Sequence, residues 1–239
     1  MADDLPDDAR FATRSVHAGT RHIEGAGSTP IFQSSTYLLN EERYAGWAAG
    51  AQHTLLYSRL SSVNSEAVVE KICSMEGAED GELFASGMAA ISTVLLGLMN
   101  QGDHVVASAD VYGGTYGLMT EDLPRFGIEV SMADMCDSAS YEAAIQSNTK
   151  MLDIETLSNP VLKVCDIPAM AEIASRHNLL LVIDNTFTSP WATRPIEMGC
   201  DLVIHSTTKY LGGHSQIIGG AVDGRADLKA TLIPRKLHI

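Results

Sequence analysis

The sequence lacks the features that mark several large classes of protein. Cysteine is scarce, and the four residues of this type include no Cys-x-x-Cys pair, so their spacing indicates neither a zinc site nor a disulfide framework. We expect all four to be reduced, buried thiols. No apolar run approaches the roughly 18 residues that a membrane span requires. The cysteines are Cys73, Cys136, Cys165 and Cys200.

Positive charge is also scarce. The chain has 16 Lys and Arg residues against 30 Asp and Glu residues, which gives a formal net charge of -14. Nucleic acid and anionic membrane surfaces would both repel such a chain, so neither is an expected partner. The first residues also lack the basic and apolar regions of a secretory signal, which favours a cytoplasmic location.

What is present is a pattern of strands alternating with helices. The chain of 239 residues is 45% hydrophobic, which is enough to bury a sizeable core. Alternating short apolar runs and helical spacing predict βαβ units around a mostly parallel sheet with helices on both faces. Residues 11–56 show little periodicity and predict an extended arm with one short helix near residues 41–48. The expected strands cover residues 104–107, 128–132, 151–154, 179–183 and 201–205.

The chain segment after the last expected strand carries a lysine. Residues 201–205 form a compact apolar run, and the hydroxyls of Ser206, Thr207 and Thr208 lead to Lys209 and a Gly-Gly break. Partial burial at such a sheet edge would disfavour the ammonium form and make the amine a Schiff-base nucleophile. Taken alone, Lys209 would more simply be a solvated lysine that ends a strand.

A second strand strengthens the case for Lys209. The apolar run at residues 179–183 ends in Asp184, and α/β proteins bind ligands at the carboxyl edge of the sheet. Asp184 and Lys209 should therefore flank one crevice. This pairing suits pyridoxal 5'-phosphate, because the lysine can bond to the aldehyde while the carboxylate keeps the pyridine nitrogen protonated. The hydroxyls of Ser206 and Thr208 would bind the phosphate.

Phosphate can also be held by the start of a helix. The sequence contains neither a Gly-x-Gly-x-x-Gly fingerprint nor a loop ending in Gly-Lys-Ser/Thr, so dinucleotide and nucleoside triphosphate enzymes are disfavoured. Ser86 and Gly87 instead precede a helix expected from about Met88, whose free amides make an anion site. The alternative is that Ser86 is a plain N-cap.

Two further side chains follow strand ends at the same edge. Tyr112 could stack on a planar cofactor ring, and the amide of Asn159 could hydrogen-bond a phenolic oxygen. As structure alone, Tyr112 could equally anchor a helix and Asn159 could belong to a turn. A metal-dependent hydrolase using Asp184, His205 and His214 is a rival interpretation, but histidines separated by a Gly-Gly turn match no usual ligand spacing.

These motifs together resemble the Cys/Met-metabolism family of pyridoxal phosphate enzymes, from about residue 11 to 227. The resemblance implies an α/β fold with an aspartate-aminotransferase-like large domain. It also implies elimination or replacement at the β or γ carbon of cystathionine, homocysteine, methionine or O-acylhomoserine. The motifs are Tyr57-Ser-Arg59, Ser86-Gly-Met-Ala, Tyr112-Gly-Gly-Thr, Glu155-Thr with Asn159-Pro160, Asp184-Asn-Thr-Phe and His205-Ser-Thr-Thr-Lys209-Tyr-Leu-Gly-Gly-His214.

The resemblance also implies a role for each matching residue. Lys209 would carry the cofactor and shuttle protons, Asp184 would pair with the pyridine nitrogen, and Asn159 would lie near the ring oxygen. Tyr112 would stack on the ring and assist the leaving group. The phosphate would be held by Ser86, Gly87, Met88, Ser206 and Thr208, with Tyr57 and Arg59 reaching in from a neighbouring subunit. A homodimer or homotetramer is therefore expected.

Three departures from the family pattern affect these expectations. Ser62-Val-Asn64 replaces the usual Asn-Pro-Thr turn, Gln216 stands where an aspartate is common, and the chain stops at Ile239. Family members continue into a smaller C-terminal domain whose arginine binds the substrate's α-carboxylate. We therefore expect impaired substrate capture, and a catalytically silent subunit or cofactor-binding scaffold is the alternative. The predicted parts are an arm (residues 1–56), a pyridoxal-phosphate-binding domain (57–230) and an atypical tail (231–239).

Overall fold

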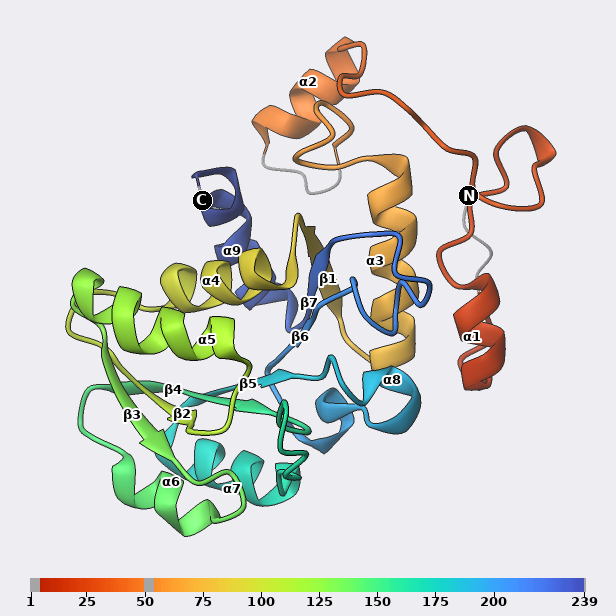
Figure 1. Ribbon diagram of the computed structural model, residues 1–239. Coiled ribbons are helices and arrows are strands. Elements are labelled where there is room, and N and C mark those ends of the chain that lie inside the picture. Colours follow the sequence, from red (N-terminus) through yellow and green to blue (C-terminus); the bar gives the residue numbers. More distant parts are fainter. Residues whose placement is uncertain (1–4, 50–53, 239) are drawn as a thin grey trace. The chain divides into compact units, whose positions relative to one another are not determined.

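The computed structural model describes residues 5–49 and 54–238 (Figure 1). The chain divides into two compact units, one running to Met75 and the other starting at Glu76. The predicted boundary after residue 56 falls within the first of these units and stays a prediction. Within the described part of the chain, no helix is both long enough and apolar enough to cross a bilayer.

The first unit holds three α-helices and the short helical segment Ile23–Gly25 among its described residues. The short helix expected near residues 41–48 is confirmed as α2 (Glu41–Ala48), which begins where Asn40 accepts the backbone N–H of Arg43. The other two are α3 (Val63–Glu76) and α1 (Phe11–His17), and α1 lies in the segment predicted as an extended arm. Arg14 explains how α1 is held, because its guanidinium donates to the carbonyl oxygens of Ala9 and Ser74 at 2.8 and 3.1 Å.

The second unit is built on a seven-stranded sheet in the order β1-β7-β6-β5-β4-β2-β3. The strands β2 to β6 are parallel, which confirms the mostly parallel sheet, whereas β7 pairs antiparallel with both β1 and β6. The strands are β1 (Asp80–Phe84), β2 (His104–Ser108), β3 (Glu129–Ala133), β4 (Thr149–Glu155), β5 (Leu180–Asp184), β6 (Leu202–His205) and β7 (Gly220–Gly224).

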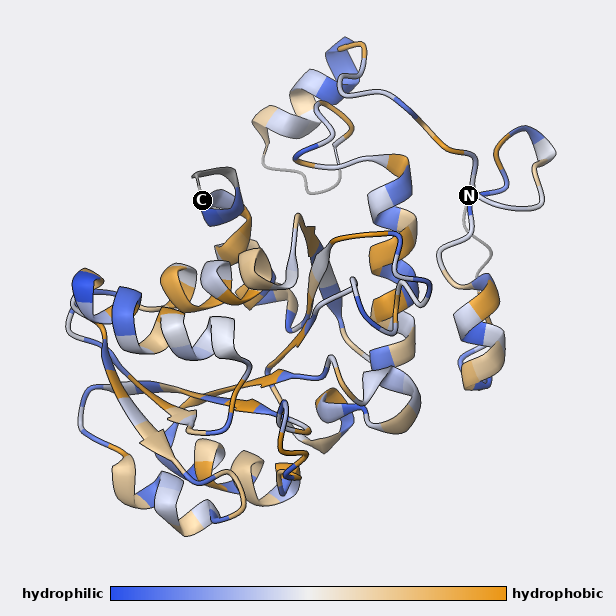
Figure 2. Cartoon of the chain, in the orientation of Figure 1, coloured by the Kyte–Doolittle hydropathy of each residue, from blue (hydrophilic) through white to orange (hydrophobic). Residues whose placement is uncertain are grey.

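Helices cover both faces of this sheet, as the sequence predicts (Figure 1). Buried side chains of α4 and α9 pack with one face, and those of α6 and α7 pack with the other. The strands between them are largely hydrophobic (Figure 2). The helices are α4 (Gly87–Leu98), α5 (Gly113–Gly117), α6 (Ser138–Ala144), α7 (Ile167–His177), α8 (Ser189–Ala192) and α9 (Ala226–His238), with shorter helical segments Leu118–Asp122, Leu123–Phe126 and Pro195–Met198.

Residues 231–238, within the segment predicted as an atypical tail, belong to α9, where Leu232 is fully buried against α4 and Lys236 pairs with Glu82 at 2.7 Å. One expectation about the cysteines needs correction. The expected burial of all four cysteines is wrong for Cys136, which is exposed in the turn after β3, whereas the other three are buried. A turn residue has no strand or helix to cover it, and spacing alone does not reveal this.

Candidate active site

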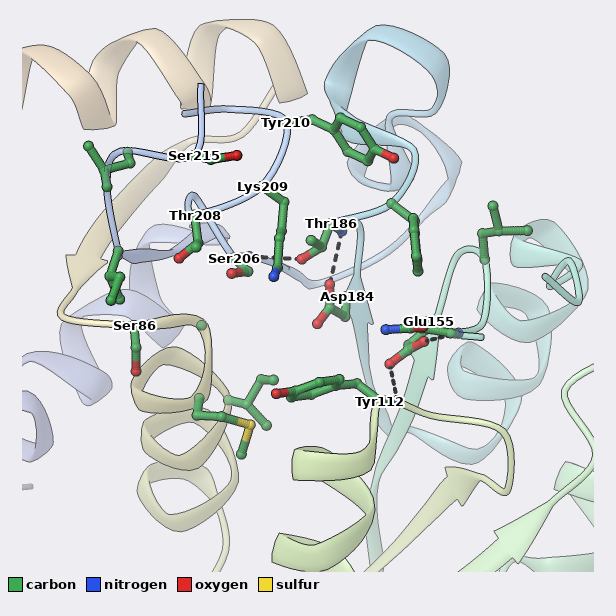
Figure 3. Close-up of a pocket in the computed structure, with 18 of the residues that line it drawn as sticks. Ser86, Tyr112, Glu155, Asp184, Thr186, Ser206, Thr208, Lys209, Tyr210 and Ser215 are labelled. Carbon is green, nitrogen blue, oxygen red and sulfur yellow. Dashed lines mark hydrogen bonds between the residues drawn. The ribbon is translucent and has the colours of Figure 1, made fainter. Parts of the chain in front are cut away.

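A pocket of about 800 Å³ opens at the carboxyl edge of the parallel strands (Figure 3). Its lining comes from the second unit and brings together most of the predicted site residues. Glu155 and Asp184 end β4 and β5, and Lys209 follows β6. The other predicted residues in the lining are Ser86, Gly87, Met88, Tyr112, Asn159, Ser206 and Thr208.

One end of the pocket is suited to an anion. The helix α4 begins at Gly87, and the amides of its first turn have no carbonyl partner within the helix. A Cβ atom at Gly87 would lie 2.8 Å from Ser206 Cβ, so glycine is needed for this close approach. The hydroxyl of Ser86 accepts the N–H of Ala89 at 3.0 Å and is therefore an N-cap. The helix start and Ser206 thus form a cradle of donors.

Thr208 contributes to this end in a different way. Its hydroxyl donates to the carbonyl oxygen of Gly219 at 3.2 Å and accepts the N–H of Gly219 at 3.1 Å. These bonds tie the segment after β6 to the segment that enters β7. Thr208 therefore shapes the wall of the cradle as well as lining it.

Lys209 lies in the turn after β6, and its N–H donates to the carbonyl oxygen of Ser206 at 3.1 Å. Its side chain points into the pocket between Ser206 and Asp184 (Figure 3). The side chain is exposed, so the partial burial expected from the sequence is wrong. The buried strand ends at His205, and the following turn places the amine in the pocket rather than within the sheet.

Asp184 lies opposite the anion cradle and is half-buried. Burial raises the pKa of its carboxyl above the usual value, while hydrogen bonds from Thr186 and the nearby His205 oppose this rise. The Thr186 hydroxyl also accepts the N–H of Ser206 at 2.8 Å. Thr186, which the sequence interpretation missed, therefore joins the end of β5 to the end of β6 (Figure 3).

The sequence patterns assign Glu155 no role of its own, yet its side chain contacts two of the predicted site residues. Its Oε1 accepts the N–H of Tyr112 at 2.6 Å, and its Oε2 accepts the N–H of Asn159 at 3.2 Å. Burial raises the pKa of this carboxyl to about 7, and the charge of Asp184 acts in the same direction. Its position as the last residue of a strand, beside the end of β5, is the sequence signal that could have found it.

A second buried carboxylate lies on the other face of the sheet. Glu76 Oε1 accepts from Asn185 Nδ2 at 2.8 Å and pairs with His205 Nε2 at 2.7 Å, and all three side chains are at most 1% exposed. Burial alone would lower the pKa of His205, but the hydrogen bond and the charge of Glu76 outweigh it and raise the pKa. The sequence interpretation assigned no role to this cluster.

This arrangement does not support the rival metal site. His205 is bound to Glu76, and His214 Nδ1 donates to the carbonyl oxygen of Gly212 at 3.3 Å. Residues 5–49 and 54–238 contain no group of three or more His, Cys, Asp or Glu side chains that could hold a metal ion.

Tyr57 and Arg59 belong to the first unit. The guanidinium carbon of Arg59 lies 5.3 Å from the centroid of the Tyr57 ring, a cation–π contact. Tyr57 is exposed. Their contribution to the site of a neighbouring subunit stays a prediction.

The donor set fits pyridoxal phosphate. The cradle at the start of α4 suits a phosphate, Lys209 offers an amine, Asp184 offers an acid for a ring nitrogen, and Tyr112 offers an aromatic face. Such a site on a mostly parallel α/β sheet defines a pyridoxal phosphate-dependent protein. More particularly, residues 12–234 match the model of the Cys/Met metabolism PLP-dependent enzyme family, and the chain belongs to this family.

Three relatives illustrate the similarity. Over 212 residues the chain is 45% identical to cystathionine gamma-lyase of Bacillus subtilis, covering 88% of this chain and 54% of that protein. The structure of metB from Corynebacterium glutamicum matches with a TM-score of 0.89 and 35% identity, covering 98% and 60% of the two chains. The putative O-acetylhomoserine (thiol)-lyase of Campylobacter jejuni, solved with N'-pyridoxyl-lysine-5'-monophosphate, matches with a TM-score of 0.88 and 34% identity, covering 94% and 56%.

Proposed function

We propose that the protein is a pyridoxal phosphate-dependent carbon–sulfur lyase or γ-replacement transferase of sulfur amino-acid metabolism. The observation that carries this proposal is the convergence of Lys209, Asp184 and the start of α4 on one pocket in a member of this family. The chain spans about half the length of the curated relatives it matches.

We assign each residue of the pocket a role from its position. Lys209 would hold the cofactor through its amine and move protons at the substrate carbon, and Asp184 would keep the pyridine nitrogen protonated. The phosphate is held by the backbone at Gly87 and Met88 and by the hydroxyl of Ser206. When bound, the cofactor ring supplies an electron sink for the substrate carbanion.

The substrate is an amino acid with a leaving group at its β or γ carbon. Support comes from the relatives, which are named as a cystathionine lyase and a putative O-acetylhomoserine (thiol)-lyase. Tyr112 assists departure of the leaving group, and Asn159 orients the ring through its oxygen. Tyr57 and Arg59 complete the site of a neighbouring subunit, so the protein works as a homo-oligomer. Its location is the cytoplasm.

The test is a comparison of wild type with Lys209→Ala after incubation with pyridoxal phosphate. Borohydride reduction followed by peptide mass spectrometry should place a pyridoxyl group on Lys209 in wild type and none in the variant. Lys150→Ala is the matched control, because Lys150 is an exposed lysine on β4. Labelling of Lys209→Ala at the wild-type level would contradict the assignment.

Turnover is measured separately with cystathionine, methionine and O-acylhomoserine, following α-keto acid, ammonia and thiol. Product formation supports an enzyme. The alternative is a catalytically silent subunit that binds the cofactor in the same pocket. Cofactor labelling without turnover of any of these substrates would support this alternative.

A further inference from the structure

We infer that Glu155 is a positioning residue whose ionised carboxylate fastens the segments carrying Tyr112 and Asn159 to the end of β4. The inference rests on the proposed function only for the roles of Tyr112 and Asn159 at the cofactor. The contacts of Glu155 themselves do not depend on that assignment.

Glu155 accepts one hydrogen bond from each of the two segments. Tyr112 follows β2 and Asn159 follows β4, and these two strands are neighbours in the sheet. Each carboxylate oxygen accepts one backbone N–H, at 2.6 Å from Tyr112 and at 3.2 Å from Asn159 (Figure 3). A bond from an amide to a charged acceptor is stronger than a neutral one. One side chain therefore sets the backbone position of both residues.

Burial makes this link sensitive to the charge of Glu155. The residue is 6% exposed, so water cannot replace a lost acceptor readily. Protonation converts one oxygen into an O–H group, which is a donor and a much poorer acceptor for a second N–H. The ionised form is thus the form that holds both segments.

Burial first, and a neighbouring carboxylate second, explain why the pKa of Glu155 lies near neutral pH. Asp153 lies on β4 with Glu155, and Asp184 on β5 is the register partner of Glu155. Lys209, after β6, lines the same pocket as Glu155. Burial raises the pKa of Glu155 to about 7, Asp184 adds to the rise, and the two N–H groups oppose it.

An ion pair links the same two segments nearer to solvent. Lys163 Nζ lies 2.6 Å from Asp110 Oδ2, and these residues flank the segments that carry Asn159 and Tyr112. The two side chains are 38% and 27% exposed. Lys163→Met therefore provides a variant that loosens the same segments without altering the carboxylate of Glu155.

The direct test is hydrogen exchange of the Tyr112 and Asn159 amides, measured by NMR on the full chain without added cofactor. In wild type, the protection factors should fall about tenfold as pH is lowered from about 8 to about 6, the scale of one lost bond to a charged acceptor. In Glu155→Gln, one of the two amides should be about tenfold less protected at both pH values. The pH step should disappear.

Three variants complete the test. Glu172→Gln makes the same chemical change on the exposed surface of α7 and should leave both amides and the pH step unchanged. Lys163→Met should lower protection but keep the pH step, whereas Glu155→Asp should restore the step in part. Wild-type protection that is independent of pH, or equal protection in wild type and Glu155→Gln, would overturn the inference. A failure of pyridoxal labelling at Lys209 would instead count against the proposed function.

Discussion

At the scale of single residues, Gly87 decides whether the anion cradle can form. A Cβ atom there would lie 2.8 Å from Ser206 Cβ and 3.0 Å from Ser206 Oγ, so Gly87→Ala must push the start of α4 away from Ser206. We expect affinity for pyridoxal phosphate to fall about tenfold or more, with a loss of about 1–3 kcal/mol in the free energy of unfolding from overpacking. Equilibrium dialysis and chemical denaturation measure the two effects.

The matched control is Gly117→Ala. Gly117 has a helical φ of -60° and no neighbouring atom within 4 Å of an added Cβ. Alanine there should leave cofactor affinity unchanged and stabilise the helix by about 0.5–1 kcal/mol. Cofactor affinity in Gly87→Ala equal to that of Gly117→Ala would show that the close contact with Ser206 is unimportant.

At this scale, the sequence predicts which site residues meet, but it predicts neither their exposure nor their long-range partners. Lys209 and Asp184 could be predicted to share a crevice, because parallel strands end at the same edge. The exposure of Lys209 could not, because it depends on the path of the turn after His205. The Glu76–His205 pair joins residues 129 positions apart, and no local pattern announces such a contact.

At the scale of secondary structure elements, Glu76 links the ends of β5 and β6, because its carboxylate bonds to both Asn185 and His205. Replacing Glu76 by glutamine removes the charge that faces a buried imidazole. Because loss of one partner of a buried ion pair is strongly destabilising, we expect Glu76→Gln to lower the free energy of unfolding by about 3 kcal/mol near pH 6. Urea titration measures this loss, with Glu172→Gln as the surface control.

The same pair predicts a pH dependence of stability. The pKa of folded His205 is raised above 6.5, so the folded state binds the proton more tightly than the unfolded state. The stabilisation is complete below about pH 6.5, the unfolded value, and is lost as pH rises through the folded pKa. The difference in stability between wild type and Glu76→Gln should therefore shrink with rising pH. A constant difference from pH 6 to 9 would contradict this.

The helix α9 is an element that the sequence pattern did not reveal. Pro234 and several charged residues obscure its periodicity, yet Leu232 is fully buried against α4, where Gly97 leaves room for it. We expect Leu232→Ala to lower the free energy of unfolding by about 2–5 kcal/mol through the cavity left behind. Met198→Ala, at a side chain that is 40% exposed, should cost far less. Equal losses in the two variants would show that α9 contributes little to the core.

At the scale of the whole molecule, the parallel part of the sheet followed from alternating strand and helix patterns, whereas the antiparallel edge did not. The strand β7 is short, begins and ends with glycine and lies between β1 and β6. Its place depends on pairing with β6, the preceding strand, and with β1, which lies about 140 residues earlier in the chain. A Cβ atom at Gly220 would lie 2.2 Å from the carbonyl oxygen of Ser86, so β7 needs glycine at this position to pack beside the start of α4.

The insertion of β7 between β1 and β6 also has a consequence for the order in which the protein matures. A ribosome delivers β1 and the start of α4 early, but the strand that connects them to β6 emerges only with residues 220–224. The sheet that joins the two halves of the phosphate cradle is therefore complete only once residues 220–224 have been added. We expect the coenzyme to bind only after that point.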